Sequence, residues 1–149
     1  MKICKMVVFG FFLVMVIVGC GRHIRGGATF KSNPAAEQAA IKATQAWLAL
    51  VDKGRYAESW QQAAVAFKST VSQTYWERAV WATRHPLGRV ISRKIESRQF
   101  ITRLPWTPPG QYVVIQFDTV FKNRANVQET ITPMLEKDGQ WKVSAYYVR

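Results

Sequence analysis

The sequence predicts an α+β fold in which three N-terminal helices pack on a four-stranded antiparallel sheet. Apolar residues recur at steps of three and four between residues 33 and 85, a spacing typical of helices with one buried face. After residue 88, segments rich in Val, Ile, Thr, Phe and Tyr alternate with turn residues, as strands do. The 149 residues are 48% hydrophobic, enough for one domain with a core.

The first helix is expected to begin at Asn33, since an Asn cap followed by Pro34 at the first helical position is a common helix start. Lys53 and Gly54 are expected to end it. Its apolar face consists of Ala36, Ala40, Ala43, Trp47 and Leu50.

Two more helices are predicted before the strands. One follows the first almost at once, with Tyr56, Trp60, Ala64 and Phe67 on one side. The segment 70–73 has the form of a capping box, which opens a third helix that ends before the His-Pro pair at 85–86. Its apolar side consists of Trp76, Ala79, Val80 and Thr83.

Four strands are predicted, over residues 89–102, 111–122, 127–136 and 140–148. A turn at 136–139 sets Leu135 opposite Trp141, Pro133 opposite Val143 and Ile131 opposite Ala145. A loop at 124–126 sets Ile115 opposite Leu135, Thr119 opposite Ile131 and Phe121 opposite Glu129. The residues expected to face the helices are Ile91, Ile95, Ile115, Phe117, Leu135, Val143 and Tyr147.

Residues 1–19 have the layout of a secretory signal peptide. Lys2 and Lys5 form a positive start, and residues 6–18 are apolar except for Gly10. A helix of this run would measure roughly 20 Å, short of the ~30 Å hydrocarbon core, so a transmembrane span is the weaker alternative. We expect export from the cytoplasm.

The end of this segment, Ile17-Val18-Gly19-Cys20, resembles the lipobox of bacterial lipoproteins. The resemblance implies cleavage between Gly19 and Cys20, lipidation of Cys20, and an envelope protein that faces the periplasm. Gly21 after the cysteine favours the outer membrane in a Gram-negative cell. Residues 20–32 would form the lipidated tether and residues 33–149 the folded domain. Alternatively, Cys20 is an ordinary small apolar residue of the signal.

The chain is strongly basic, with a formal net charge of +12. Loss of Lys2 and Lys5 with the signal would leave 19 basic and 9 acidic residues. Because an exported domain rarely meets nucleic acid, anionic lipids or cell-wall polymers are the expected electrostatic partners. The alternative is a solvated strand face without a partner. The candidate contacts are Arg89, Arg93, Lys94, Arg98 and Arg103.

Helices followed by a curved antiparallel sheet resemble the nuclear transport factor 2-like superfamily, a cone with a pocket between sheet and helices. The segment 47–60, WLALVDKGRYAESW, looks like the first helical hairpin of that superfamily. Together with 86–88, 92–94, 112–116 and 132–147, it resembles an uncharacterised bacterial family, domain of unknown function 4019. That resemblance implies a fold but no reaction, catalytic residue or cofactor.

The sequence holds no paired-His metal motif, CxxC, phosphate-binding glycine loop or nucleophile elbow. His23 falls in the tether, and His85 before Pro86 is typical of a helix end. Enzymes of the cone superfamily use an Asp base with a Tyr donor, but the predicted register points Asp118 away from the core. No catalytic residue, metal or cofactor is predicted.

Six residues could line a pocket for an apolar ligand, although packing in the core would explain the same pattern. The leading hypothesis is therefore a noncatalytic envelope lipoprotein that binds a partner protein or a small apolar ligand. The alternatives are an isomerase or dehydratase in the cone, and an electrostatic adaptor. The six candidate pocket residues are Trp47, Trp60, Trp76, Phe117, Thr119 and Tyr147.

Overall fold

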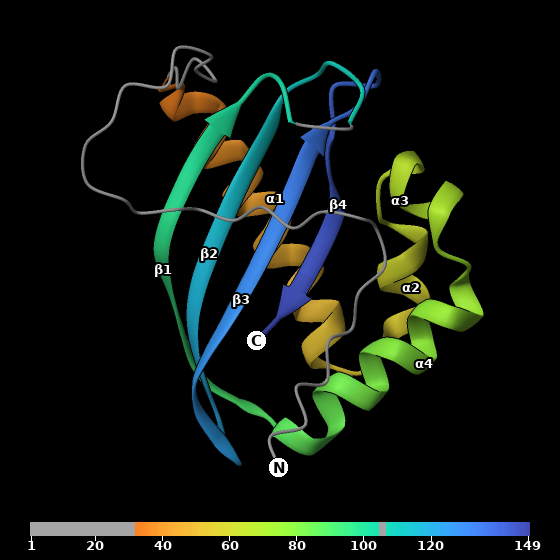
Figure 1. The fold of residues 1–149 in the computed structure, drawn as a ribbon, viewed down its shortest axis with the longest axis vertical. Coiled ribbons are helices and arrows are strands. Elements are labelled where there is room, and N and C mark those ends of the chain that lie inside the picture. The colour runs from red at the N-terminus through yellow and green to blue at the C-terminus, as the bar shows by residue number, and fades with distance from the viewer. Residues whose placement is uncertain (1–31, 105–106) are drawn as a thin grey trace, which may run out of the picture.

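The computed structural model describes residues 32–104 and 107–149, and within them it confirms the α+β fold class. A four-stranded antiparallel sheet has the order β1-β2-β3-β4, and α1 packs across one of its faces while the shorter helices lie beside β4 (Figure 1). The elements are α1 (Pro34–Asp52), α2 (Tyr56–Gln61), α3 (Val65–Thr70), α4 (Gln73–Arg84), a 3₁₀ turn (His85–Leu87), β1 (Val90–Ile101), β2 (Tyr112–Phe121), β3 (Arg124–Leu135) and β4 (Trp141–Val148).

Helix α1 begins and ends as predicted. The Asn33 side chain accepts a hydrogen bond from the Ala36 N–H at 3.2 Å, which satisfies one of the free donors of the first turn. Gly54 follows the helix with a φ of 71°, a conformation that glycine adopts without strain. None of the helices within the described ranges is long and apolar enough to cross a membrane.

The prediction of one helix between residues 56 and 67 is wrong, because the structure has two short helices there. The chain leaves α2 after Gln61, and the Ala64 N–H donates to the carbonyl of Val143 on β4 at 2.9 Å. Helix α4 also begins two residues later than the capping box suggested, since Ser72 is its cap and accepts from the Tyr75 N–H. The described residues therefore form four α-helices in place of the predicted three.

The predicted pairing of β3 with β4 is partly confirmed. Leu135 lies opposite Trp141, and Pro133 lies opposite Val143. An irregularity between Thr132 and Pro133 then shifts the register, so that Ile131 faces Tyr146 and not Ala145. The shift brings Tyr146 to the core side in place of Tyr147, because one residue of slip exchanges the faces of a strand.

The predicted pairing of β2 with β3 is wrong by four residues at Ile115 and Thr119, and by five at Phe121, which follows a register irregularity. Ile115 lies opposite Ile131, Thr119 opposite Val127 and Phe121 opposite Arg124, because the turn is the pair 122–123 and not 124–126. The Asn123 N–H donates to the carbonyl of Leu87, which ties this turn to the 3₁₀ turn. An even shift preserves the faces, so the predicted inward residues of β2 stay inward.

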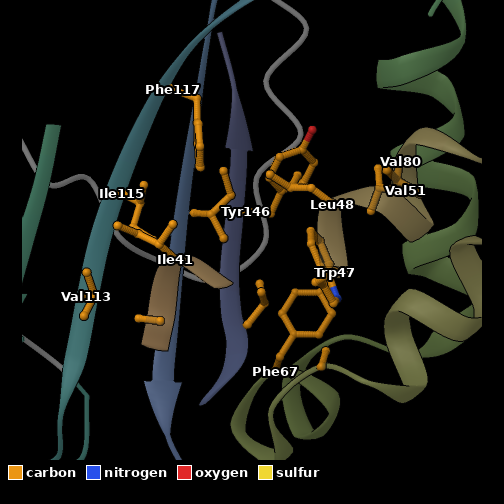
Figure 2. Close-up of a cluster of buried hydrophobic side chains, with 14 of the residues drawn as sticks. Ile41, Trp47, Leu48, Val51, Phe67, Val80, Val113, Ile115, Phe117 and Tyr146 are labelled. Carbon is orange, nitrogen blue, oxygen red and sulfur yellow. The ribbon is translucent and has the colours of Figure 1, made fainter. Parts of the chain in front are cut away.

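The core lies between α1 and the sheet, and the short helices close its side (Figure 2). Ile115, Phe117 and Val143 are buried as predicted. Ile91 is 51% exposed, against prediction, because an irregularity between Val90 and Ser92 interrupts the alternation of β1. Of the other predicted core residues, Ile95, Leu135 and Tyr147 are half-buried.

Candidate functional site

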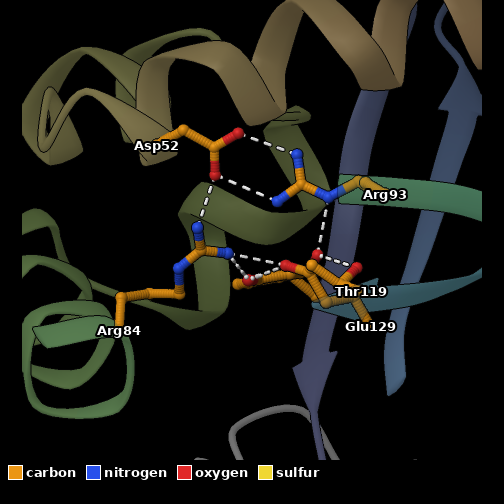
Figure 3. A network of polar contacts seen from close by, with 6 residues as sticks. Asp52, Arg84, Arg93, Thr119 and Glu129 are labelled. Atoms are coloured by element: carbon orange, nitrogen blue, oxygen red, sulfur yellow. Dashed lines mark hydrogen bonds and ion pairs between the residues drawn. The ribbon is translucent and has the colours of Figure 1, made fainter. Parts of the chain in front are cut away.

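A network of polar side chains lies where the C-terminal ends of α1 and α4 meet the sheet (Figure 3). Six elements contribute one residue each. They are Asp52 from α1, Arg84 from α4, Arg93 from β1, Thr119 from β2, Glu129 from β3 and Tyr146 from β4. We call this set the Glu129 network.

Glu129 is fully buried, with an exposed fraction of 0%, and its carboxylate accepts four hydrogen bonds. Oε1 accepts from Arg84 Nη1 at 2.6 Å and from the Tyr146 hydroxyl at 2.6 Å. Oε2 accepts from Arg93 Nε at 2.6 Å and from Thr119 Oγ1 at 2.7 Å. Two of the four donors are cations, which is the kind of pairing that a buried carboxylate needs.

Asp52 is the second carboxylate of the network, and it joins the two arginines. Arg93 binds it through two nitrogens, with Nη1 to Oδ2 at 2.7 Å and Nη2 to Oδ1 at 3.0 Å, and Arg84 donates to Oδ1 as well. The guanidinium of Arg84 also lies over the ring of Phe121, with 4.5 Å to the centroid. Two cations are thus balanced by two carboxylates.

The electrostatics of the network follow from this balance. Burial on its own would lower the pKa of both arginines. The pKa of Arg84 is nevertheless raised, by its interactions with Tyr146 and by the negative charges of Glu129 and Asp52. The pKa of Arg93 is raised by its hydrogen bonds to Asp52 and Glu129 and by their negative charges. Burial raises the pKa of Tyr146 well above its ordinary value, and the charge of Glu129 adds to the effect. Both arginines are therefore permanently charged, and the tyrosine keeps its proton at neutral pH.

A buried carboxylate beside a tyrosine is the geometry that the enzyme hypothesis required, and Glu129 and Tyr146 provide it. The carboxylate is nevertheless saturated, because donors of the protein itself occupy its acceptor positions. The cavity beside Tyr146 holds about 10 Å³, the room of one water molecule at most. A general base must reach its substrate, so this arrangement serves structure better than catalysis.

Three of the predicted pocket residues are tryptophans that pack together with their ring nitrogens bonded. Trp47 Nε1 donates to the Ser59 carbonyl at 2.7 Å, and Trp76 Nε1 donates to the Ser59 hydroxyl at 2.9 Å. Trp60 Nε1 donates to the Val71 carbonyl at 2.7 Å. The rings of Trp47 and Trp76 contact each other at a tilt, and both make edge contacts with Tyr146, so these side chains fill the space between helices and sheet.

The remaining pocket candidates do not surround an open space either. Phe117 is 2% exposed and belongs to the core, and Thr119 belongs to the Glu129 network. Tyr147 is half-buried, and burial raises its pKa.

The structure does not gather the five basic candidates on one face. Arg93 is bound in the Glu129 network, and Arg98 Nε pairs with Glu37 on α1 at 3.0 Å. Arg89, Lys94 and Arg103 are exposed. Neighbouring residues of a strand point to opposite faces, so Lys94 cannot share the side that Arg93 takes.

The other sequence candidates have simple surroundings. His85 is exposed at the end of α4 and stacks on Trp81, with ring centroids 4.7 Å apart. Asp118 is exposed, which confirms that it points away from the core. Gly19, Cys20 and His23 lie outside the described residues. In the described part of the chain, no group of three or more His, Cys, Asp or Glu residues could hold a metal ion.

Sequence reasoning missed the Glu129 network, although one signal for it was present. Val127, Glu129 and Ile131 alternate along β3, and both neighbours at this spacing are buried. A charged residue at a core position of a strand requires a buried partner of opposite charge. No pattern in the sequence identifies Arg84 and Arg93 as those partners, because they come from elements 45 and 36 residues away.

Comparison with known proteins gives a family and no function. A family model described as "Protein of unknown function (DUF4019)" matches residues 43–146. No curated protein and no solved structure matches the chain.

Proposed function

Given that the chain belongs to the DUF4019 family of proteins of unknown function, we propose that it is a noncatalytic lipoprotein of the bacterial envelope. Its lipid anchor is Cys20, and its folded domain binds a partner protein through its surface. The observation that carries the proposal is the closed interior, in which packed aromatic rings leave about 10 Å³ beside Tyr146.

The closed interior favours a partner protein over a small ligand. A pocket for a small molecule usually measures 300–1,000 Å³, roughly thirty times or more the cavity beside Tyr146. The tryptophans that could have lined a pocket are instead hydrogen-bonded and packed. Because the interior of the described residues leaves so little space beside Tyr146, we infer that the domain recognises its partner on the surface.

The anchor is supported by the sequence alone. The basic start, the apolar run and the lipobox-like end of residues 1–20 are the parts of a lipoprotein signal. Twelve residues then separate Cys20 from Asn33, and an extended chain of that length spans about 40 Å. The domain would therefore reach partners near its own membrane, facing the periplasm. Gly21 favours the outer membrane in a Gram-negative cell.

The anchor is tested with the full-length chain expressed in a bacterium fed an alkyne-bearing fatty acid. We expect the wild type to carry the label in the membrane fraction, and Cys20→Ser to lose both label and processing. Cys4→Ser is the matched control, because Cys4 leaves with the signal and its loss changes nothing downstream. Equal labelling of wild type and Cys20→Ser would contradict the anchor.

The resemblance to the nuclear transport factor 2-like superfamily remains part of this proposal. A sheet with α1 across one face supports it, and so does the placement of the short helices beside β4. A cone of that kind with its interior filled would serve as a scaffold for surface recognition.

A second candidate function is electrostatic adhesion to anionic lipid or cell-wall polymer, through a set of residues of which only Arg89 was predicted. Arg89, Lys122 and Arg124 are exposed, and the Lys122 N–H donates to the Arg89 carbonyl at 2.8 Å, so the three lie at one end of the sheet. Within the described ranges, none of them forms an ion pair.

This second function is tested by replacing Arg89, Lys122 and Arg124 together with Ser and measuring binding to anionic vesicles, with Lys137→Ser as control. Loss of vesicle binding in the triple variant alone would support it. Binding to anionic vesicles that survives high salt would exclude it.

A further inference from the structure

The surface between α2 and α4 has the features of a protein-docking site. A shallow open groove there is lined by Tyr56 from α2 and by Glu77, Arg78, Trp81 and Ala82 from α4. Helices α2 and α4 lie side by side along this surface (Figure 1). Trp, Tyr and Arg are the residue types that contribute most often to the binding energy of interfaces, and the groove holds one of each.

Trp81 is the strongest single indication. Its side chain is 54% exposed, whereas Trp47 and Trp76 are 3% and 4% exposed in the core. One face of its ring stacks on His85 at an angle of 21°, which holds the indole in place. When a partner covers a large aromatic side chain that is already held in place, removal of its apolar surface from water favours binding.

The charges around the groove indicate the chemistry of the partner. The carboxylate of Glu77 accepts from Gln73 Nε2 at 2.8 Å, and Glu58 pairs with Arg55 at the start of α2. Arg78 is exposed and forms no ion pair in the part of the chain that the structure describes. Glu77 and Arg78 carry opposite charges, but within the described residues only the side chain of Arg78 has neither a hydrogen bond nor an ion pair, so Arg78 is the charged group of the groove that is open to a carboxylate of a partner. The net charge of the chain is positive as well.

We propose that this groove is the partner-binding surface and that it takes an acidic amphipathic helix of the partner protein. An apolar side chain of that helix packs against Trp81 and Tyr56, and a carboxylate forms a two-pronged ion pair with Arg78. The groove is open and is lined by residues of the adjacent helices α2 and α4, a shape that fits a helix of the partner better than a small molecule, which is usually surrounded by its pocket. The inference rests on the proposed function, since it names the surface and the partner chemistry of that function.

The test is a display library of helical peptides selected on the purified full-length lipoprotein in detergent micelles. We expect the selected peptides to be acidic and to bind Trp81→Ala about 30-fold more weakly than wild type, as for a residue that dominates an interface. Ile91→Ala is the matched control, because Ile91 is also apolar and 51% exposed but lies on β1. All variants must melt as the wild type does.

A charge exchange separates recognition from a structural effect. Arg78→Glu should reject the selected peptides and accept their Glu-to-Lys counterparts, whereas Arg124→Glu should bind as wild type does. Basic selected peptides, equal binding to Trp81→Ala, or failure of the library to yield groove-dependent binders would each overturn the inference. Fatty-acid labelling at Cys20 is independent of these outcomes, so the groove can fail while the anchor stands.

Discussion

Replacement of Glu129 by Gln tests the physical account of the buried network. The side chain keeps its size but loses its charge, so the buried Arg84 and the partly buried Arg93 are left with Asp52 as their one carboxylate. The new amide also points a donor at groups that already donate to Glu129 Oε1 and Oε2. Removing one partner of a buried ion pair costs about 3–5 kcal/mol.

That cost is large beside the ~5–15 kcal/mol by which domains of this kind are stable. Urea unfolding followed by far-UV circular dichroism measures it, and with an m value of ~2 kcal/mol/M the midpoint should fall by roughly 2 M. Asp118→Asn is the matched control, because Asp118 is exposed, and its effect should stay within about 0.5 kcal/mol.

A second substitution sharpens the test. Adding Arg93→Leu to Glu129→Gln leaves one cation, Arg84, facing one carboxylate, Asp52. The double variant should therefore lose less stability than the two single losses combined, which marks coupling between the sites. A loss below about 1 kcal/mol for Glu129→Gln, or strict additivity in the double variant, would refute the reasoning.

Three further outcomes are expected. The raised pKa of Tyr146 contributes stability that is complete below about pH 10 and is lost as the pH rises through the pKa of the folded state. The stability of the wild type should therefore fall above about pH 10 more steeply than that of Tyr146→Phe. Parallel pH profiles of the urea midpoints of the two proteins would contradict this. Ser59→Ala leaves the Trp76 indole N–H without its acceptor and should lower the free energy of unfolding by about 1–3 kcal/mol. The control is Ser69→Ala, since Ser69 is exposed. Equal thermal midpoints of the two variants would be inconsistent with this cost. Gly88→Ala should lower the thermal midpoint more than Gly139→Ala does. Both glycines have a positive φ, but of the two only Gly88 would bring a Cβ within 4 Å of another atom, Asn123 Nδ2 at 3.1 Å. Equal shifts of the two thermal midpoints would contradict a cost from this contact.

Local signals in the sequence predicted the elements of this fold well. The Asn33 cap and Gly54 set the bounds of α1, and the apolar alternation of β2 placed Ile115 and Phe117 in the core. These features depend on a residue and its near neighbours, which a sequence displays directly.

Features that depend on distant contacts could not be predicted in the same way. The break between α2 and α3 follows from the bond of the Ala64 N–H to β4, and the tight turn before Arg124 follows from contacts of Asn123 with the 3₁₀ turn. The Glu129 network is the clearest case, because its six residues come from six elements. Arg93 looked like a surface cation for this reason, and its carboxylate partners became visible only in the folded chain.

The most direct test of the proposed function is the mass of the protein extracted from bacterial membranes, measured first under native and then under denaturing conditions. The denatured chain should begin at Cys20 and carry the added mass of acyl chains, and the native measurement should show no retained small molecule. A chain that begins at Met1 without added mass, or a stoichiometric small molecule released on unfolding, would contradict an anchored domain with a closed interior.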